Sequence, residues 1–345
     1  YNIKNFSMQQ HKLEFKGKNF FVRGYLTSED AGDSYDTRFA AINVNREWKS
    51  DVDWFTQYAG AYFSSGSHAA ARAFADQGRL EPGTPAFNAA LDKVIADPDL
   101  TTGAKFQDKT KYYHADANLN LRDYIDWAEF QVGGSYRLYS LNSNGSIFTD
   151  YDGPIEYNEY GVYTQAQKKF LEDDRLKVTT SIRYDKAQNF DGNYSPRVSF
   201  AYAGGENKNQ NFRASFQTGF RNPTTQDQYI GLNAGRGYLV GSAEDNLDRY
   251  TTQPIAVSTT GQFIANTFGS TAIGATTSIS GRSAYENAFS QSSVEDFAVG
   301  KVAAPSNANV SLVKPEKVTA FEVGYRGLVP VKEANLTIDL SVYYN

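Results

Sequence analysis

Apolar and polar residues alternate with a period of two along much of this chain. Between residues 112 and 122 the odd positions are apolar and the even positions mostly polar, and the run 128–138 repeats the pattern. Successive side chains of a β-strand point to opposite faces, so each run predicts a strand with one apolar and one polar face. Further runs follow at 176–185, 198–202, 212–221 and 336–344, with looser alternation at 157–170 and 319–327.

The length of these runs decides between two all-β architectures. Strands of a soluble antiparallel sandwich also alternate, but they usually hold about five or six residues. A strand that crosses a membrane in a β-barrel needs about ten. The runs here are closer to the second length, and their apolar faces stay aromatic or β-branched to the strand ends, as aromatic girdles do. The pattern therefore predicts a transmembrane antiparallel β-barrel.

The connections between the runs differ strongly in length. From residue 111 onward short and long connections mostly alternate, with a brief one at 189–194 where a long one is due. Bacterial barrels combine short periplasmic turns with long extracellular loops. On this assignment the run 112–122 enters from outside, and residues 222–314 form an extracellular lid or binding loop. The short connections are 16–19, 123–126, 172–175, 204–210 and 328–333, and the long ones are 65–110, 142–154 and 222–314.

The first third of the chain combines strand-like and helix-like patterns. Residues 20–28 and 37–48 are predicted as strands around a loop at 29–36. Residues 54–64 fit either a strand or a helix, and a helix there would reverse the direction assigned to the first strands. Two extracellular loop helices are predicted: 68–76, capped by Ser67 and closed by Gly78, and 85–96, capped by Thr84 with Pro at its first position.

Composition supports the membrane interpretation. The chain has 24 Tyr and 23 Phe with one Met, and its mean hydropathy is -0.54. The absence of Cys excludes disulfides and thiol chemistry. A net charge of -5 argues against nucleic acid as a partner, because phosphate binding needs a basic surface. The chain has no apolar stretch long enough for a transmembrane helix, and residues 1–4 do not begin a signal peptide.

Catalytic and metal-binding motifs are not found. The three histidines, His11, His68 and His114, share no ligand spacing. Asp30, Asp33 and Asp36 around Gly32 resemble a calcium loop only loosely, because the closing Glu is missing, and a solvated loop is favoured. Phosphate-binding loops, nucleophile elbows and HExxH are absent. We therefore predict no enzyme activity, cofactor or metal.

Several motifs resemble TonB-dependent outer-membrane receptors. Residues 213–224 (RASFQTGFRNPT) are similar to the strand-end signature of that family, and residues 313–326 (VKPEKVTAFEVGYR) to one of its strand starts. Tyr184-Asp185 and residues 194–199 (YSPRVS) match a further pattern. Residues 226–229 (QDQY) and 71–76 (ARAFAD) resemble the version common in Bacteroidetes. The resemblance spans residues from about 20 to 345.

The resemblance implies a 22-stranded barrel filled by an N-terminal plug, with a segment that binds TonB. Neither plug nor coupling segment is found in this sequence, which ends in mid-strand. Open barrel edges are costly in lipid, so residues 1–345 are expected to be a partial barrel domain of a longer protein, with about ten to twelve strands.

The resemblance also suggests which residues meet a ligand. Candidates at the rim and in the extracellular loops are Arg221, Asn222, Thr224, Gln226 and Tyr229. For Arg221 and Glu316, a structural role at the rim is favoured over ligand contact. Pro196 and Pro315 are expected where strands begin, since a missing donor costs little there. Gly219 and Gly324 are expected on the inward face, where they would leave room for a plug.

The function implied is active import of a ligand across the outer membrane, driven through TonB. Ligand classes of the family are siderophores, cobalamin, glycans and peptides, and a surface lipoprotein lid is a further possible partner beside outer-membrane lipid. The alternatives are a passive porin or adhesin-type barrel, and a soluble all-β binding module. A plug sequence upstream would separate importer from porin, and solubility without detergent would identify the soluble module.

Overall fold

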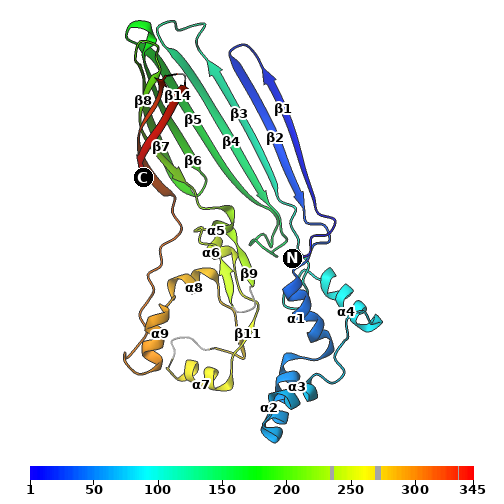
Figure 1. Cartoon of the computed structure of the whole chain (residues 1–345). Helices are drawn as coiled ribbons and strands as arrows, with labels where there is room; N and C mark the ends of the chain where they lie inside the picture. Colours follow the sequence, from blue (N-terminus) through cyan, green and yellow to red (C-terminus); the bar gives the residue numbers. More distant parts are fainter. Residues whose placement is uncertain (234–236, 269–272, 333) are drawn as a thin grey trace.

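The computed structural model describes residues 1–233, 237–268, 273–332 and 334–345. Its main feature is a ten-stranded antiparallel sheet that is long, curved and open, with β1 and β14 at its edges (Figure 1). The predicted all-β antiparallel architecture and the number of strands are confirmed. In sheet order the strands are β1 (Ser7–Lys16), β2 (Phe20–Asp30), β3 (Lys111–Asn120), β4 (Glu129–Leu141), β5 (Ile155–Phe170), β6 (Leu176–Ala187), β7 (Phe190–Gly204), β8 (Gln210–Arg221), β13 (Glu316–Val331) and β14 (Ala334–Tyr344).

The register keeps one apolar and one polar face across the whole sheet. Phe216 of β8, for example, lies opposite Val198 of β7 and Phe321 of β13. Phe212 is 49% exposed and Leu340 62% exposed, because no second sheet covers this face within the described residues. Ten adjoining strands therefore present an uncovered hydrophobic wall, which excludes the soluble sandwich and suits contact with lipid.

Aromatic side chains gather at two levels of the apolar face. Near one end Tyr184 lies against Tyr194, with ring centroids 4.9 Å apart. Near the other end Phe212 lies between Tyr202 and Tyr325, at 6.4 Å and 5.1 Å. Tyr194 and Tyr202 are eight residues apart on β7, which is about 27 Å along a strand and about 21 Å across a membrane at a tilt near 40°. This spacing matches the aromatic girdles of a transmembrane barrel.

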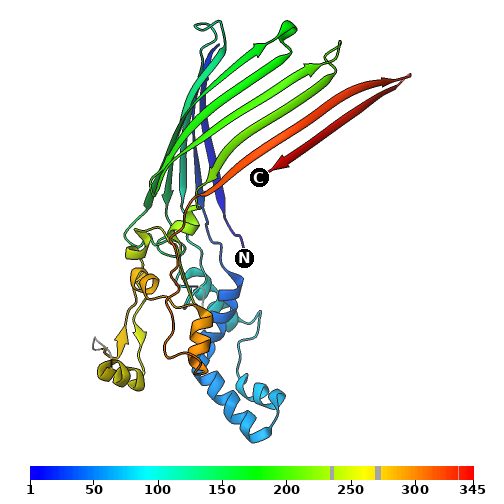
Figure 2. The ribbon, with the colours of Figure 1, turned by 90° about the vertical axis from the view of Figure 1, so that its left-hand side faces the viewer.

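The two ends of the sheet carry different connections. One end holds the tight turns, including the 3-10 turn η1 (Glu172–Asp174), and is called the turn end here. The other, the loop end, holds the connections 31–110, 142–154 and 222–315 (Figure 2). The alternation predicted from residue 111 onward is confirmed. The brief connection at 189 is a tight turn on the loop end, and Glu333 of the last predicted turn lies outside the described residues.

The first loop lobe is helical, which corrects one prediction. Its helices are α1 (Thr37–Trp48), α2 (Asp51–Ser65), α3 (His68–Ala75) and α4 (Pro85–Ala96). Residues 37–48, expected as a strand, form α1 because Asp36 caps its first amides, and Phe39 and Val44 pack with Val94 of α4. Residues 54–64 are helical too. A helix at 37–48 and a helix at 54–64 each replace one segment that could have been a strand. Because two strands are removed, the direction assigned to the first strand is unchanged, and β2 runs toward the loop end.

The two predicted loop helices are confirmed with their caps. Ser67 Oγ accepts from the amide of Ala70, and Thr84 Oγ1 accepts from the amide of Phe87. No helix in the described ranges is long and apolar enough to cross a membrane.

The second lobe follows β8 and packs on the loop end of the sheet. Tyr229 is fully buried there among Leu141, Phe148, Ile155 and Tyr157. This lobe therefore shares a hydrophobic core with β4 and β5. Its elements are α5 (Thr225–Tyr229), β9 (Gly231–Asn233), β10 (Tyr238–Val240), α6 (Asn246–Arg249), β11 (Ile255–Ala256), α7 (Thr259–Phe268), β12 (Thr276–Thr277), α8 (Gly281–Glu286) and α9 (Gln291–Ala298).

The sheet divides between β7 and β8 near the loop end. Their pairing ends at Arg197 opposite Gln217, while β7 continues beside β6 and β8 continues beside β13. Pro196, expected at a strand start, instead lies inside β7 where this pairing ends. Proline has no amide proton, so it marks the division at little cost in hydrogen bonds. Pro315 directly precedes β13, as predicted.

Candidate functional site

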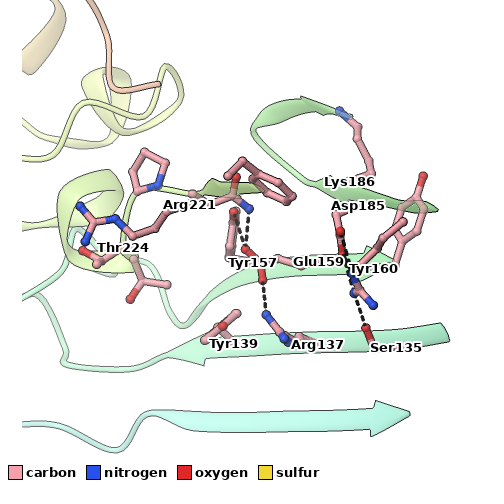
Figure 3. A pocket seen from close by; sticks show the side chains of 15 residues that line it. Ser135, Arg137, Tyr139, Tyr157, Glu159, Tyr160, Asp185, Lys186, Arg221 and Thr224 are labelled. Atoms are coloured by element: carbon pink, nitrogen blue, oxygen red, sulfur yellow. Dashed lines mark hydrogen bonds and ion pairs between the residues drawn. The ribbon is translucent and has the colours of Figure 1, made fainter. Parts of the chain in front are cut away.

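A cavity of about 460 Å³ lies on the polar face at the loop end and is called the mouth pocket here (Figure 3). Strands β4, β5 and β6 form its floor, and the end of β8 with the start of α5 lies over it. The pocket exists because β8 leaves β7 and reaches across to β5: Asn222 Nδ2 donates to Glu159 Oε1 at 3.0 Å. Its polar and aromatic lining consists of Ser135, Arg137, Tyr139, Tyr157, Glu159, Tyr160, Arg183, Asp185, Lys186, Asn222 and residues 220–225 around it.

Two ion pairs organise the floor. Arg137 Nη1 lies 3.3 Å from Glu159 Oε2. Arg183 Nη2 lies 2.6 Å from Asp185 Oδ1 and donates to Ser135 Oγ at 3.1 Å. Since these groups are only partly buried, each pair contributes little to stability, but together they fix several donors and acceptors facing the cavity.

Glycines leave room for two arginine side chains of the polar face, Arg183 in the pocket floor and Arg213 on β8. A Cβ atom on Gly161 would collide with Asp185 and Arg183, and one on Gly324 would collide with Arg213. These glycines leave space for charged side chains to lie flat along the polar face. The predicted inward location of Gly219 and Gly324 is confirmed by the register, but the room at Gly324 serves Arg213.

A row of aromatic rings crosses the same face. Tyr25 lies against Tyr112, Tyr112 against Tyr139, and Tyr139 against Tyr157, with centroids 5.9, 4.9 and 5.8 Å apart. Tyr157 then contacts Tyr229 of α5 at 6.2 Å. The sequence pattern did not reveal this row. Each tyrosine lies on a different strand, among the mostly polar residues of its face. The row offers ring faces and hydroxyl groups to a polar ligand.

The structure places the five candidate ligand residues in different roles. Arg221 is exposed and pairs with Glu316 at 3.1 Å, and Asn222 lines the pocket with its Oδ1 unpartnered. Thr224 also lines it, but it caps α5 in a box with Asp227. Gln226 is exposed on α5 outside the lining, whereas Tyr229 is buried.

Hydrogen bonds around α5 hold the roof of the pocket. Asn189, in the turn between β6 and β7, donates to the hydroxyl of Tyr229 at 2.7 Å and to Gln228 Oε1 at 2.8 Å. Thr224 holds the pKa of Asp227 below its usual range through hydrogen bonds from its hydroxyl and its amide. Burial raises the pKa of Tyr229, so its phenol stays neutral and packs as part of the core.

A second cavity of about 480 Å³ continues from the mouth pocket along the polar face. The two share Arg137 and Arg183. Its lining includes His114 and Asp116, and Arg23 binds Asp116 through two contacts of 2.8 Å. The polar face therefore carries a hydrophilic path from the loop end toward the middle of the sheet.

The loosely calcium-like aspartates have separate structural roles. Asp30 accepts from the amide of Gly32, Asp33 accepts from Asn5, and Asp36 caps α1. Across the described ranges no group of three or more His, Cys, Asp or Glu side chains is arranged to hold a metal.

The family model described as "TonB dependent receptor-like, beta-barrel" matches residues 6–345. This chain belongs to that family. TonB-dependent receptors are outer-membrane receptors and transporters of Gram-negative bacteria, which places the chain in that membrane, with the apolar face toward lipid and the polar face toward the barrel interior. The more specific Bacteroidetes resemblance stays a prediction. A search of curated proteins found no match.

Solved structures similar to this receptor chain include siderophore receptors. PirA from Pseudomonas aeruginosa is 11% identical with a TM-score of 0.44, and the match covers 98% of this chain and 39% of PirA. A mutant of the ferric enterobactin receptor PfeA from the same organism is 11% identical with a TM-score of 0.44, and the match covers 98% of this chain and 34% of PfeA. PirA from Acinetobacter baumannii is 9% identical with a TM-score of 0.37, and the match covers 97% of this chain and 47% of that PirA. The chain spans less than half the length of each.

Proposed function

We propose that this chain is the ligand-capturing part of an active importer that draws energy from TonB. The observation that carries the proposal is the mouth pocket and its continuation along the polar face. A ligand held at the loop end would have a hydrophilic path into the barrel interior, opened when a plug outside this chain is displaced. No covalent step is required of the described residues.

The lining favours a polar ligand with acceptor or anionic groups. Arg137, Arg183 and Arg221 face or border the mouth pocket, against the carboxylates of Glu159 and Asp185. Asn222 would contribute an unpartnered Oδ1 at its edge, and Thr224 a nearby hydroxyl. Siderophores, cobalamin, glycans and peptides are all compatible with these groups. For a glycan or peptide, a surface lipoprotein could cover the loops as a lid.

Uptake by cells that produce the full-length receptor tests this proposal. Cells are supplied in turn with radiolabelled ferric siderophores, cobalamin, oligosaccharides and peptides, with and without a functional TonB gene. We expect saturable uptake of one class that disappears without TonB. Uptake that persists without TonB and rises linearly with concentration would favour the passive porin.

Two variants connect uptake to the mouth pocket. Asn222→Ala should raise the half-saturating concentration severalfold, because it removes groups at the cavity edge. Gln226→Ala is the matched control, since Gln226 lies on the same short segment but is exposed outside the lining. Equal effects of the two substitutions would place ligand binding elsewhere.

A further inference from the structure

A cavity of about 500 Å³ opens where the sheet divides near the loop end. We call it the seam pocket: it lies between the end of the β6–β7 hairpin, residues 186–193, and the segments 242–244 and 312–317 of the second lobe. The amide of Val313 donates to Ser242 Oγ at 3.2 Å, which joins the two lobe segments. The hairpin and the chain leading into β13 thus form its opposite walls.

Three lysines line the seam pocket: Lys186, Lys314 and Lys317. Within the described residues none of the three has a carboxylate within 4.0 Å, although Asp191 and Glu244 also line the cavity. Lys186 Nζ donates to the carbonyl oxygen of Phe190 at 2.6 Å, which uses one of its three protons. The pocket therefore has ammonium groups with donors available to an anion.

The position of the seam pocket identifies the kind of anion. Lys186 lies two residues beyond Tyr184 on the lipid-facing side of β6, and Tyr184 is part of the aromatic belt near the loop end. Lys317 lies on the same side of β13, opposite Phe220 of β8. Lysines just beyond an aromatic belt sit at the depth of lipid headgroups, where phosphate is the abundant anion.

We propose that the seam pocket binds the phosphorylated headgroup of a lipid in the outer leaflet of the membrane. The lysines neutralise the phosphate. The acyl chains extend from there toward the turn end, along the exposed apolar wall beside Tyr194 and Ile182. The cavity is larger than a phosphate ion needs, so there is room for the sugar or glycerol that carries the phosphate. This binding site borders the mouth pocket, with which it shares Lys186, but its other two lysines, Lys314 and Lys317, do not line that pocket.

Lipid retention by the purified full-length receptor tests the proposal. The receptor is placed in nanodiscs with phosphorylated lipid A or with lipid A whose phosphates have been removed, and bound lipid is counted by native mass spectrometry. A lysine near an anionic surface contributes about fivefold in affinity. We therefore expect the triple variant Lys186→Gln, Lys314→Gln, Lys317→Gln to bind phosphorylated lipid A roughly a hundredfold more weakly.

A matched variant removes three lysines at the turn end instead: Lys16→Gln, Lys177→Gln and Lys208→Gln. It should retain lipid like the unmodified receptor, and all three proteins should keep the same heat-dependent gel mobility, which reports the folded barrel. Three results would overturn the proposal: unchanged binding by the seam variant, equal binding of dephosphorylated lipid A, or complete displacement of the lipid by 100 mM inorganic phosphate. The last would indicate a site for free anions only.

Discussion

Substitutions at Val198 and Ser199 test the assignment of the two faces. These neighbours on β7 point to opposite sides, and Val198 lies four residues from both Tyr194 and Tyr202. At about 3.4 Å per residue and a tilt near 40°, Val198 is about 10 Å from each aromatic belt and thus near the middle of the bilayer. Its cross-strand neighbours, Thr180 and Phe216, offer no carboxylate to an introduced charge.

Val198→Arg should cost about 2–4 kcal/mol of unfolding free energy, the range for arginine at the midplane of a barrel wall. This corresponds to a decrease of roughly 30- to 700-fold in the folding equilibrium constant. Ser199→Arg should change it by no more than about 0.5 kcal/mol. The reason is that its neighbours Thr179 and Ser215 are short, polar and on the hydrated face.

The assay is equilibrium unfolding of the full-length receptor from phospholipid vesicles by guanidinium chloride, followed by tryptophan fluorescence. Val198→Phe is a second control. A fluid bilayer accommodates the larger ring, so this variant should be as stable as the original, whereas a close-packed protein interior would lose about 1–3 kcal/mol. Equal costs for the two arginine variants, or a large cost for Val198→Phe, would refute the assignment of the apolar face to lipid.

Three further predictions concern the loop end. Gly161→Ala should displace the Arg183–Asp185 pair and weaken ligand binding severalfold, as measured by isothermal titration. Thermal stability should be unchanged, because the atoms that an added Cβ would meet belong to flexible side chains. Gly219→Ala is the control, because a Cβ there would meet only Val318 at 3.4 Å. The hydrogen-exchange protection factors of α5, which correct for the intrinsic pH dependence of exchange, should fall as pH decreases from the ordinary pKa of Asp227, 3.8, through its lowered value, since the stabilising carboxylate is lost on protonation. Asp227→Asn should abolish this pH dependence. Tyr229→Phe should lower stability by about 1 kcal/mol in thermal denaturation without changing ligand affinity, because it removes a buried hydrogen bond; a large affinity loss would restore Tyr229 as a ligand contact.

The strands could be predicted because their pattern is local. Alternation and turn length depend on neighbouring residues, so the faces of β8 and β13 and the capped helices α3 and α4 follow from short stretches of sequence. Residues 37–48 were misread because the stripe that buries Phe39, Ala40 and Val44 is fixed by α4, some fifty residues away, and not by the segment itself. Tertiary packing here outweighs local pattern.

The mouth pocket was less accessible to prediction. Motif resemblance located the end of β8 correctly, and Asn222 and Thr224 do line the cavity. Glu159, however, meets Asn222 across 63 positions of sequence, and no local pattern announces that contact. Tyr229 shows the opposite problem: an aromatic residue in a loop motif suggests recognition, but here it anchors the loop by burial.

Both loop lobes leave and re-enter the sheet on adjacent, hydrogen-bonded strands. The first is bounded by β2 and β3, where Ser28 lies opposite Lys111, and the second by β8 and β13, where Arg221 lies opposite Glu316. The two ends of each lobe are therefore held at neighbouring positions of the wall, and the second lobe is held in addition by the core around Tyr229. Exchanging the first lobe between related proteins would leave the strands and their packing intact, because its core is formed by its own residues. Exchanging the second lobe would also require matching residues on β4 and β5, so the first lobe is freer to change in evolution.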